Sequence, residues 1–393
     1  MKIISVTTTR FRYTTSVWRD LEGHPSVGKE HESQNTLLTI KADSGAEGYA
    51  FGGVSEEICK SVIEPAMIGE DAFDREKIWQ RFRRIQKLNH NLTDMIMAAA
   101  DIALWDLCGR FLNIPVYKML GGNRKKILAY ASIMPGDETP GGLSSPEDYA
   151  NFSKKLVSRG YKAIKLHLWC PPISWAPSLK KDIEACEAVR DAVGPEIDLM
   201  LDPHHHYSRQ EAKELGRAIE KLDFVWLEEP MNEHSMSSYI WLCDQLDIAI
   251  LGPENIEGSF KSRAEWAKFG ACDMLRGGAG EVGGITALIK LVHLAESFGM
   301  NMEVHGGQGA NIQVLAAMGI DGTYYEKGLE HPFRNLDIGP QWFKTPFEPL
   351  DKDGFVHVPE LPGIGEDINF DYIKDNKITN TQILHLLDIL TFH

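Results

Sequence analysis

Three acidic residues stand at the ends of three expected strands, at a regular interval along the chain. Asp202 ends DLMLD, Glu228 ends FVWLE and Glu254 follows AILGP, so that 26 residues separate each acid from the next. One strand plus one helix of a β/α barrel takes about this length, because roughly 250 residues make eight such units. The C-terminal ends of parallel barrel strands share one face, where the three carboxylates would converge. Convergent carboxylate oxygens suit a hard divalent cation, above all Mg²⁺.

The pattern after residue 126 favours a parallel barrel over an open sheet. Eight apolar segments are typical of strands, and most are separated by amphipathic helical segments such as RQEAKELGRAIEKL. The expected strands are ILAYAS, KAIKLHL, IDLMLD, DFVWLE, DIAILG, CDMLR, NMEV and TYYE. Prolines interrupt the helical pattern after the eighth strand, so only a weak helix is expected there.

The segment before the barrel has a different pattern, in which strands are followed by helices. The chain has 393 residues, which is long enough for a barrel and one further domain. We expect an α+β capping domain at 1–125, the barrel at 126–346 and a C-terminal segment at 347–393 that returns to the capping domain. A polar stretch at about 14–35 is expected to be an irregular loop, and long loops in compact domains are often functional.

Composition excludes several classes of function. The net charge is −15, the pI is about 5.4 and no long basic run occurs, so nucleic acid is not an expected partner. No segment approaches the ~20 apolar residues of a membrane helix, and MKIISVTTTRF lacks the features of a signal peptide. The six cysteines form no CxxC pair and are typical of buried free thiols in a reducing compartment. The expected location is the cytoplasm.

Several motifs together resemble one known family over nearly the whole chain. They are AAADIALWDLCGRFLNIPVYKMLGG at 98–122, AIKLH, LMLDPH, WLEEP, LGPEN, EVGGITALIK, EVHGG and YYE. In this order they resemble the enolase superfamily and, within it, the mandelate racemase-like group. The resemblance implies an α/β fold, a modified TIM barrel (β/α)7β with an N-terminal α+β capping domain. It also implies that Asp202, Glu228 and Glu254 are the Mg²⁺ ligands and that Glu229 faces another way.

The resemblance assigns a base to the end of the second barrel strand. Lys165 matches the first lysine of the family's Lys-x-Lys motif, whereas the second position is His167, a departure from the pattern. Residues two apart on a strand project to the same side, so both side chains are expected inside the barrel. A neighbouring divalent cation favours the neutral lysine that a base requires. His167 is either a catalytic group or an orienting one.

A histidine is expected on the opposite side of the substrate. His305, in EVHGG, matches it, but the aspartate that usually ends strand six is replaced by Gly278. Without an anionic partner, the pKa of His305 is expected to fall, which weakens it as a base but leaves a role as an acid. Glu281 and Glu303 are alternative partners.

Two further residues are candidate catalytic groups by resemblance. His204 completes Asp-Pro-His, as in the sugar-acid dehydratases of the group, where that histidine helps protonate the departing hydroxyl. Glu326, ending strand eight, matches the acid that hydrogen-bonds the substrate carboxylate. A buried, protonated carboxylic acid can donate to developing negative charge.

The polar stretch is expected to cover the barrel mouth and to select the substrate. Its candidate substrate-binding residues are Trp18, Arg19, His24 and His31, which suit a hydroxylated anion. The implied reaction removes the proton α to a carboxylate and then expels a β-hydroxyl as water, so that a sugar acid gives a 2-keto-3-deoxy acid. The small carboxylate is the expected partner, together with further copies of the chain in a homo-oligomer.

Other outcomes of the same site remain open. A cycloisomerase of a sugar lactone or anhydro-sugar acid, or a racemase or epimerase, would begin with the same proton abstraction. A ligand-binding relative without activity is a further alternative, and its only support is Gly278.

Overall fold

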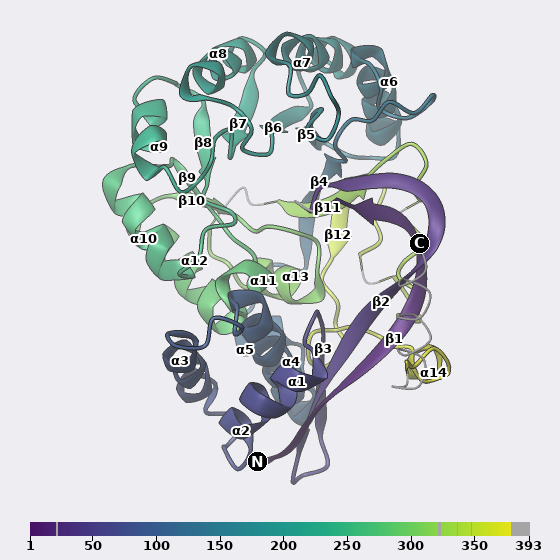
Figure 1. The fold of residues 1–393 in the computed structure, drawn as a ribbon, viewed down its shortest axis with the longest axis vertical. Coiled ribbons are helices and arrows are strands. Elements are labelled where there is room, and N and C mark those ends of the chain that lie inside the picture. Colours follow the sequence, from purple (N-terminus) through teal and green to yellow (C-terminus); the bar gives the residue numbers. More distant parts are fainter. Residues whose placement is uncertain (21–22, 321–323, 336, 347, 379–393) are drawn as a thin grey trace, which may run out of the picture.

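The computed structural model describes residues 1–393 except 21–22, 321–323, 336, 347 and 379–393. An antiparallel sheet opens the chain in the order β1 (Ile3–Arg19), β2 (Pro25–Ala42), β3 (Glu47–Phe51). Helices follow and pack against it (Figure 1). They are α1 (Glu56–Ile58), the π-helical turn η1 (Cys59–Ile63), α2 (Glu64–Met67), α3 (Arg75–Gln86), α4 (Asp94–Leu112) and α5 (Val116–Met119).

The long ribbon of β1 and β2 corrects the expectation of an irregular loop at about 14–35. Strand pairing continues from Thr14 opposite Glu32 to Arg19 opposite Pro25, with one shift in register. The expectation failed because this part of the ribbon is polar on both faces and therefore lacks the apolar alternation of a half-buried strand. In Figure 1 the ribbon arches from the capping domain towards β4 and β11.

Strands β4 to β11 curl into the barrel with parallel pairing throughout (Figure 1). They are β4 (Lys126–Ile133), β5 (Ala163–His167), β6 (Asp198–Asp202), β7 (Phe224–Glu228), β8 (Ala249–Gly252), β9 (Met274–Arg276), β10 (Asn301–Glu303) and β11 (Tyr325–Glu330). The order runs from β10 through β4 to β11, and β12 (Phe355–His357) pairs antiparallel with β4. All eight strands expected from the sequence are present.

Helices connect each barrel strand to the next. They are α6 (Pro146–Ser158), α7 (Leu179–Val193), α8 (Arg209–Glu220), α9 (Met236–Cys243), α10 (Phe260–Phe269), α11 (Ala279–Val282), α12 (Ile285–Phe298) and α13 (Gly309–Leu315). Within the described part of the segment between β11 and β12, no helix occurs, so the barrel is (β/α)7β as expected. A capping box at Ser208 and Glu211 starts α8, and amphipathic faces of the outer helices cover the strands.

The capping domain is joined to the barrel through buried polar contacts. Asp101 on α4 accepts hydrogen bonds from the backbone nitrogen of Thr286 at 2.9 Å and from its hydroxyl at 2.6 Å. Trp79 on α3 donates from Nε1 to the carbonyl of Gly283 at 2.8 Å. These contacts fix the capping helices against the start of α12.

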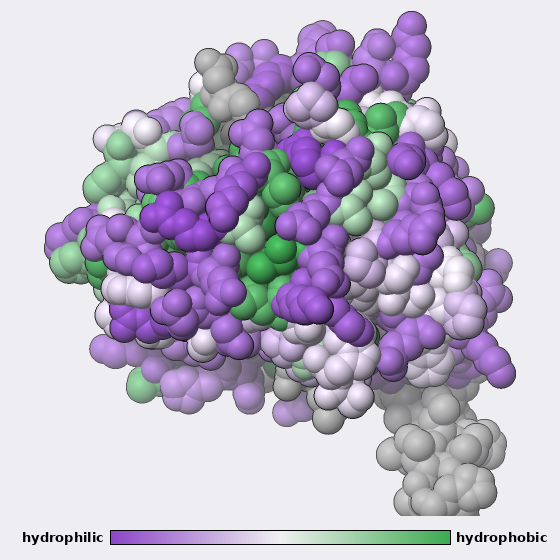
Figure 2. Space-filling view, turned by 90° about the horizontal axis from the view of Figure 1, so that it is seen from above, coloured by the Kyte–Doolittle hydropathy of each residue, from purple (hydrophilic) through white to green (hydrophobic). Residues whose placement is uncertain are grey.

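Part of the C-terminal segment lies against the ribbon, where helix α14 (Phe370–Asp375) contacts β1. Just before this segment, the ring of Trp342 meets that of Phe11 at 5.8 Å between centroids. Residues 379–393 of this segment lie outside the described part. The face seen in Figure 2 is mainly hydrophilic. No helix among the described residues is long and apolar enough to span a membrane, and all six cysteines are free thiols, as expected.

Candidate active site

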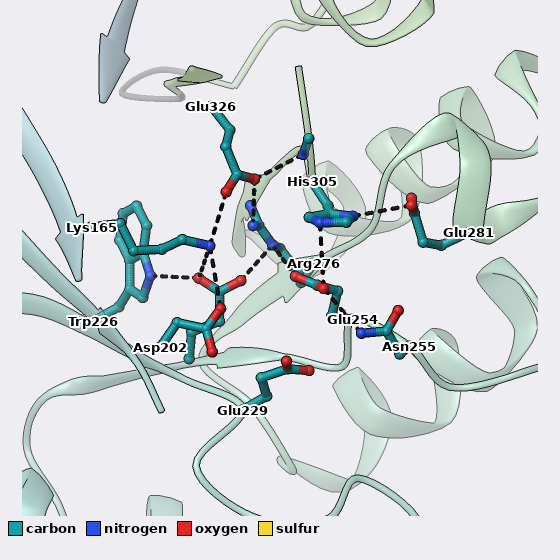
Figure 3. A network of polar contacts seen from close by, with 12 residues as sticks. Lys165, Asp202, Trp226, Glu229, Glu254, Asn255, Arg276, Glu281, His305 and Glu326 are labelled. Atoms are coloured by element: carbon teal, nitrogen blue, oxygen red, sulfur yellow. Dashed lines mark hydrogen bonds and ion pairs between the residues drawn. The ribbon is translucent and has the colours of Figure 1, made fainter. Parts of the chain in front are cut away.

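Three buried carboxylates meet at the C-terminal ends of neighbouring strands (Figure 3). Asp202 ends β6, Glu228 ends β7 and Glu254 lies just after β8, and one oxygen from each lies within 4.8 Å of the other two. Carboxylate oxygens at such spacing form the donor set of a hard divalent cation, so the residues present fit the expected metal. Glu229 lies apart from this triad, as expected, and burial raises its pKa well above the usual value, with Glu254 adding to the effect.

Arg276 links two acids of the triad to Glu326, and it was not predicted from the sequence as a site residue. Its Nε lies 2.8 Å from Oε1 of Glu228 and 3.2 Å from Oε2 of Glu254, and its Nη2 lies 2.8 Å from Oε2 of Glu326. The side chain is fully buried at the end of β9, and a buried charge requires such partners. The sequence could have identified Arg276 as a site residue, because it ends the apolar segment CDMLR just as the acids stand at the ends of their own strands.

Lys165 projects into the barrel and reaches the same carboxylates. Its Nζ lies 3.1 Å from Glu228, 3.1 Å from Glu326 and 3.4 Å from Asp202. Burial disfavours the charged amine, but the carboxylates of Glu228 and Glu326 outweigh it and hold the pKa of Lys165 well above its usual value. The predicted base is therefore placed at the triad as an ammonium group.

His167 projects to the same side as Lys165, as alternation along β5 predicts. Its Nδ1 lies 2.6 Å from the carbonyl oxygen of Ile133, and its Nε2 lies 3.0 Å from Oδ2 of Asp202. Both nitrogens are thus engaged with protein oxygens. This arrangement favours the orienting role that the sequence left open, with Asp202 as the group oriented.

His204 packs on His167 rather than standing apart. The two rings are stacked with centroids 4.5 Å apart, and the backbone nitrogen of His204 donates to Oδ1 of Asp202 at 3.0 Å. Burial lowers the pKa of His204 to about 3. A ring that is neutral near pH 7 is poorly prepared to donate a proton to a leaving hydroxyl.

His305 has two anionic neighbours. Its Nδ1 lies 3.1 Å from Oε1 of Glu281, and its Nε2 lies 3.4 Å from Oε1 of Glu254 (Figure 3). Burial acts to lower the pKa, but Glu254 and Glu281 outweigh it and raise the pKa of His305 to about 10. The expected fall in pKa is therefore wrong. Of the two alternative partners, Glu281 is present, whereas Glu303 accepts from the backbone of Tyr324.

The geometry explains why Gly278 and Glu281 occur together. A Cβ atom at Gly278 would lie 2.4 Å from the carbonyl oxygen of His305 and 2.5 Å from Oε2 of Glu281. No side chain fits there without displacing one of these groups. Glu281, in α11, thus fills the space beside His305 from a position three residues later in the chain.

Glu326 is ionised, which corrects the expectation of a protonated acid. It accepts from the backbone nitrogen of Gly306 at 2.8 Å and forms ion pairs with Lys165 and Arg276. These partners outweigh burial, so the pKa of Glu326 lies well below its usual value. The carboxylate holds Lys165 in place and does not carry a proton to donate.

The four predicted substrate-binding residues lie on the β1–β2 ribbon, but they differ in position. Trp18 and His31 pack on each other with ring centroids 3.8 Å apart, and Arg19 donates from Nη1 to a carbonyl of the ribbon turn. His24 is 7% exposed, and its ring centroid lies 5.3 Å from that of His204. The structure thus brings His24 against the barrel loops.

Comparisons with known proteins cover both parts of the chain. Residues 12–121 match the family described as mandelate racemase / muconate lactonizing enzyme, N-terminal domain, and residues 148–372 match the family described as enolase C-terminal domain-like. The crystal structure of D-glucarate dehydratase from Agrobacterium tumefaciens, complexed with magnesium, is 50% identical, with a TM-score of 0.95 over 96% of this chain and 100% of that one.

Two curated relatives are similar at lower identity. Arabinonate dehydratase from Saccharolobus solfataricus is 25% identical over 359 residues, which are 88% of this chain and 92% of the relative. D-Galactarolactone cycloisomerase from Agrobacterium fabrum is 27% identical over 360 residues, which are 87% of this chain and 90% of the relative. The similarity extends over the capping domain and the barrel alike.

Proposed function

We propose that this chain, which belongs to the enolase superfamily and to its mandelate racemase-like group, is a magnesium-dependent dehydratase of a sugar acid. The observation that carries the proposal is the asymmetry of the site. Lys165 and His305 stand on either side of the carboxylates, and Glu281 faces Nδ1 of His305 (Figure 3). One side thus presents Lys165, which acts as a base once its ammonium group has lost a proton, and the other side presents a proton donor. Elimination of water requires this pairing.

Asp202, Glu228 and Glu254 would hold Mg²⁺. The proposal is supported by their donor geometry and by the similarity to the glucarate dehydratase that is complexed with magnesium. When bound, the cation supplies positive charge for the substrate carboxylate as its α-proton leaves, and it competes for the carboxylates that keep Lys165 protonated.

Lys165, in its neutral form, takes the proton from the α-carbon. Its Nζ is held at the triad by Glu228 and Glu326, which fix the amine at one side of the site. The proton moves from the α-carbon to Nζ, while Arg276, paired with Glu228 and Glu254, holds these two carboxylates in position.

His305 gives a proton to the departing β-hydroxyl, which leaves as water. Glu254 and Glu281 favour the protonated form of the ring, and Glu281 orients it through Nδ1, so Nε2, which lies 3.4 Å from Glu254, is the atom that donates. A racemase would need a neutral His305 to accept a proton from the α-carbon, whereas the carboxylates of Glu254 and Glu281 outweigh burial, raise its pKa to about 10 and keep the ring protonated near pH 7. The pair therefore favours elimination over two-base racemisation.

A screen of aldonic and aldaric acids with Mg²⁺ tests the proposal. We expect a 2-keto-3-deoxy acid from at least one of them, detected as its semicarbazone and confirmed by NMR, and loss of the product in excess chelator. Glu228→Gln is the matched control, because it removes one ligand oxygen at nearly constant volume. An epimer or a rearranged lactone as the only product would reject dehydration and favour an isomerase.

A further inference from the structure

A second group of ligand atoms lies near the carboxylate triad but differs in chemistry. One ligand atom each of His24, Cys170 and His206 lies within 4.8 Å of the other two. His24 belongs to the turn of the ribbon, Cys170 to the loop after β5 and His206 to the loop after β6. We propose that these three side chains bind a borderline-soft divalent cation, for which Zn²⁺ is the best fit.

The donor set selects against Mg²⁺ and in favour of zinc. Two imidazole nitrogens and a thiolate sulfur are ligands of Zn²⁺, whereas Mg²⁺ prefers oxygen. Zn–N bonds near 2.05 Å and Zn–S bonds near 2.3 Å place tetrahedral ligand atoms about 3.3–3.6 Å apart. Because the three atoms already lie within 4.8 Å of one another, binding requires them to approach by no more than about 1.5 Å. Three protein ligands leave one position for water.

The ring of His24 is held as a metal ligand requires. Its Nδ1 lies 3.0 Å from Oδ2 of Asp20, and Oδ1 of Asp20 accepts from the backbone nitrogen of His24 at 2.9 Å. A carboxylate at one imidazole nitrogen fixes the tautomer and makes the other nitrogen a better donor to a metal. Because Asp20 engages Nδ1, Nε2 of His24 is the atom that we assign as the ligand.

The cluster is distinct from the triad, and two of its three side chains are buried, whereas that of His206 is partly exposed. His24 is 7% exposed and Cys170 is 5% exposed, and neither belongs to the carboxylate group. Among the described residues, Cys170 is the one cysteine of the six that shares such a group with histidines. Burial of His24 and Cys170 strengthens coordination because fewer waters compete there.

A cation at this cluster would tie the two domains together at the site entrance. His24 comes from the capping domain, whereas Cys170 and His206 come from loops that follow barrel strands. Zinc should therefore raise the thermal unfolding temperature. If the ribbon must move for substrate to enter, zinc should also slow turnover. This effect on turnover rests on the proposed function, but binding itself does not.

Zinc stoichiometry measures the proposal directly. The full chain, held in millimolar Mg²⁺ to fill the triad, is dialysed against Zn²⁺ and analysed by inductively coupled plasma mass spectrometry. We expect one zinc per chain, which Cys170→Ser and His206→Ala should each lose. Cys186→Ser, which alters a buried thiol on α7, should keep it. Glu228→Gln should keep it too, so a failed triad and a failed zinc site give different results.

Cobalt gives an independent signature. Co²⁺ bound at this cluster should show a thiolate-to-cobalt charge-transfer band in the near ultraviolet, absent from Cys170→Ser. If Cys170→Ser does not fold, an alkylation experiment on the unaltered chain takes the place of this comparison. In that experiment, bound Zn²⁺ should protect the thiol of Cys170 from the alkylating reagent. Zinc retained in full by Cys170→Ser, no thiolate band with cobalt, or alkylation of Cys170 unaffected by zinc would each overturn the proposal.

Discussion

Glu281 contacts Nδ1 of His305 at 3.1 Å from a position three residues after the strand-end site, which Gly278 occupies. The pair restores an anionic partner that the sequence had seemed to lack. Because a side chain at Gly278 would collide with both groups, the glycine and the glutamate form one arrangement. The alternative of a ligand-binding relative without activity, whose support was Gly278, is weakened accordingly.

Glu281→Gln should slow product formation more than proton exchange. The amide no longer stabilises a protonated His305, so we expect turnover to fall by about 10²-fold, the lower range of a lost general acid. Exchange of the α-proton at Lys165 should fall much less. Turnover followed by keto-acid formation and exchange followed by NMR in D₂O measure the two. Equal losses in both, or none, would argue against a proton-donating role.

Replacement of each histidine in turn identifies the acid. His305→Asn should lower product formation by at least about 10²-fold. His204→Asn should have the smaller effect, because its buried ring is neutral at pH 7 and already lacks the proton to donate. Steady-state rates of the two variants with one substrate decide the matter. A larger loss in His204→Asn would restore the role first expected for that residue.

Arg276→Met should destabilise the metal-free protein. The change leaves Glu228, Glu254 and Glu326 without their shared cation, and removal of one partner from a buried ion pair costs about 3–5 kcal/mol. Mg²⁺ should recover part of the loss, because it neutralises two of these three carboxylates. Urea unfolding with and without Mg²⁺ measures the effect, with Arg276→Lys as an intermediate control. An unchanged free energy of unfolding would contradict the structural role of Arg276.

Asp101 should make stability depend on pH. Burial raises its pKa to about 6, above the value of 3.8 for an unperturbed aspartate, even though Thr286 donates to both oxygens. The folded protein therefore retains this proton more strongly, so its contribution is complete below about pH 4 and is lost as pH rises through about 6, a change of about 3 kcal/mol. Asp101→Asn should lack this slope when unfolding is followed between pH 4 and 7. If the free energies of unfolding of Asp101→Asn and of the unaltered chain changed with pH in the same way, the pH dependence could not be assigned to Asp101.

The features that could be predicted from the sequence are those that depend on local hydrophobic periodicity and on the order of motifs along the chain. The barrel strands follow from the apolar segments, and the triad follows from the acids that end or closely follow three of them, such as Asp202. The polar ribbon at 14–35 was missed because backbone pairing, rather than an apolar face, defines its strands. The partner of His305 could only be narrowed to two glutamates, since the backbone between Gly278 and Glu281 decides which one reaches the ring. The charge state of Glu326 likewise depends on Lys165 and Arg276, which reach it from other strands of the barrel.

One NMR experiment in D₂O tests the central claim of a one-way elimination that Lys165 begins. The unaltered enzyme, Lys165→Ala and Glu281→Gln are each incubated with Mg²⁺ and the sugar acid identified by the screen. We predict that the unaltered enzyme forms the 2-keto-3-deoxy acid, that Lys165→Ala shows neither α-proton exchange nor product, and that Glu281→Gln exchanges the α-proton faster than it forms product. Normal exchange and product formation by Lys165→Ala would contradict the account.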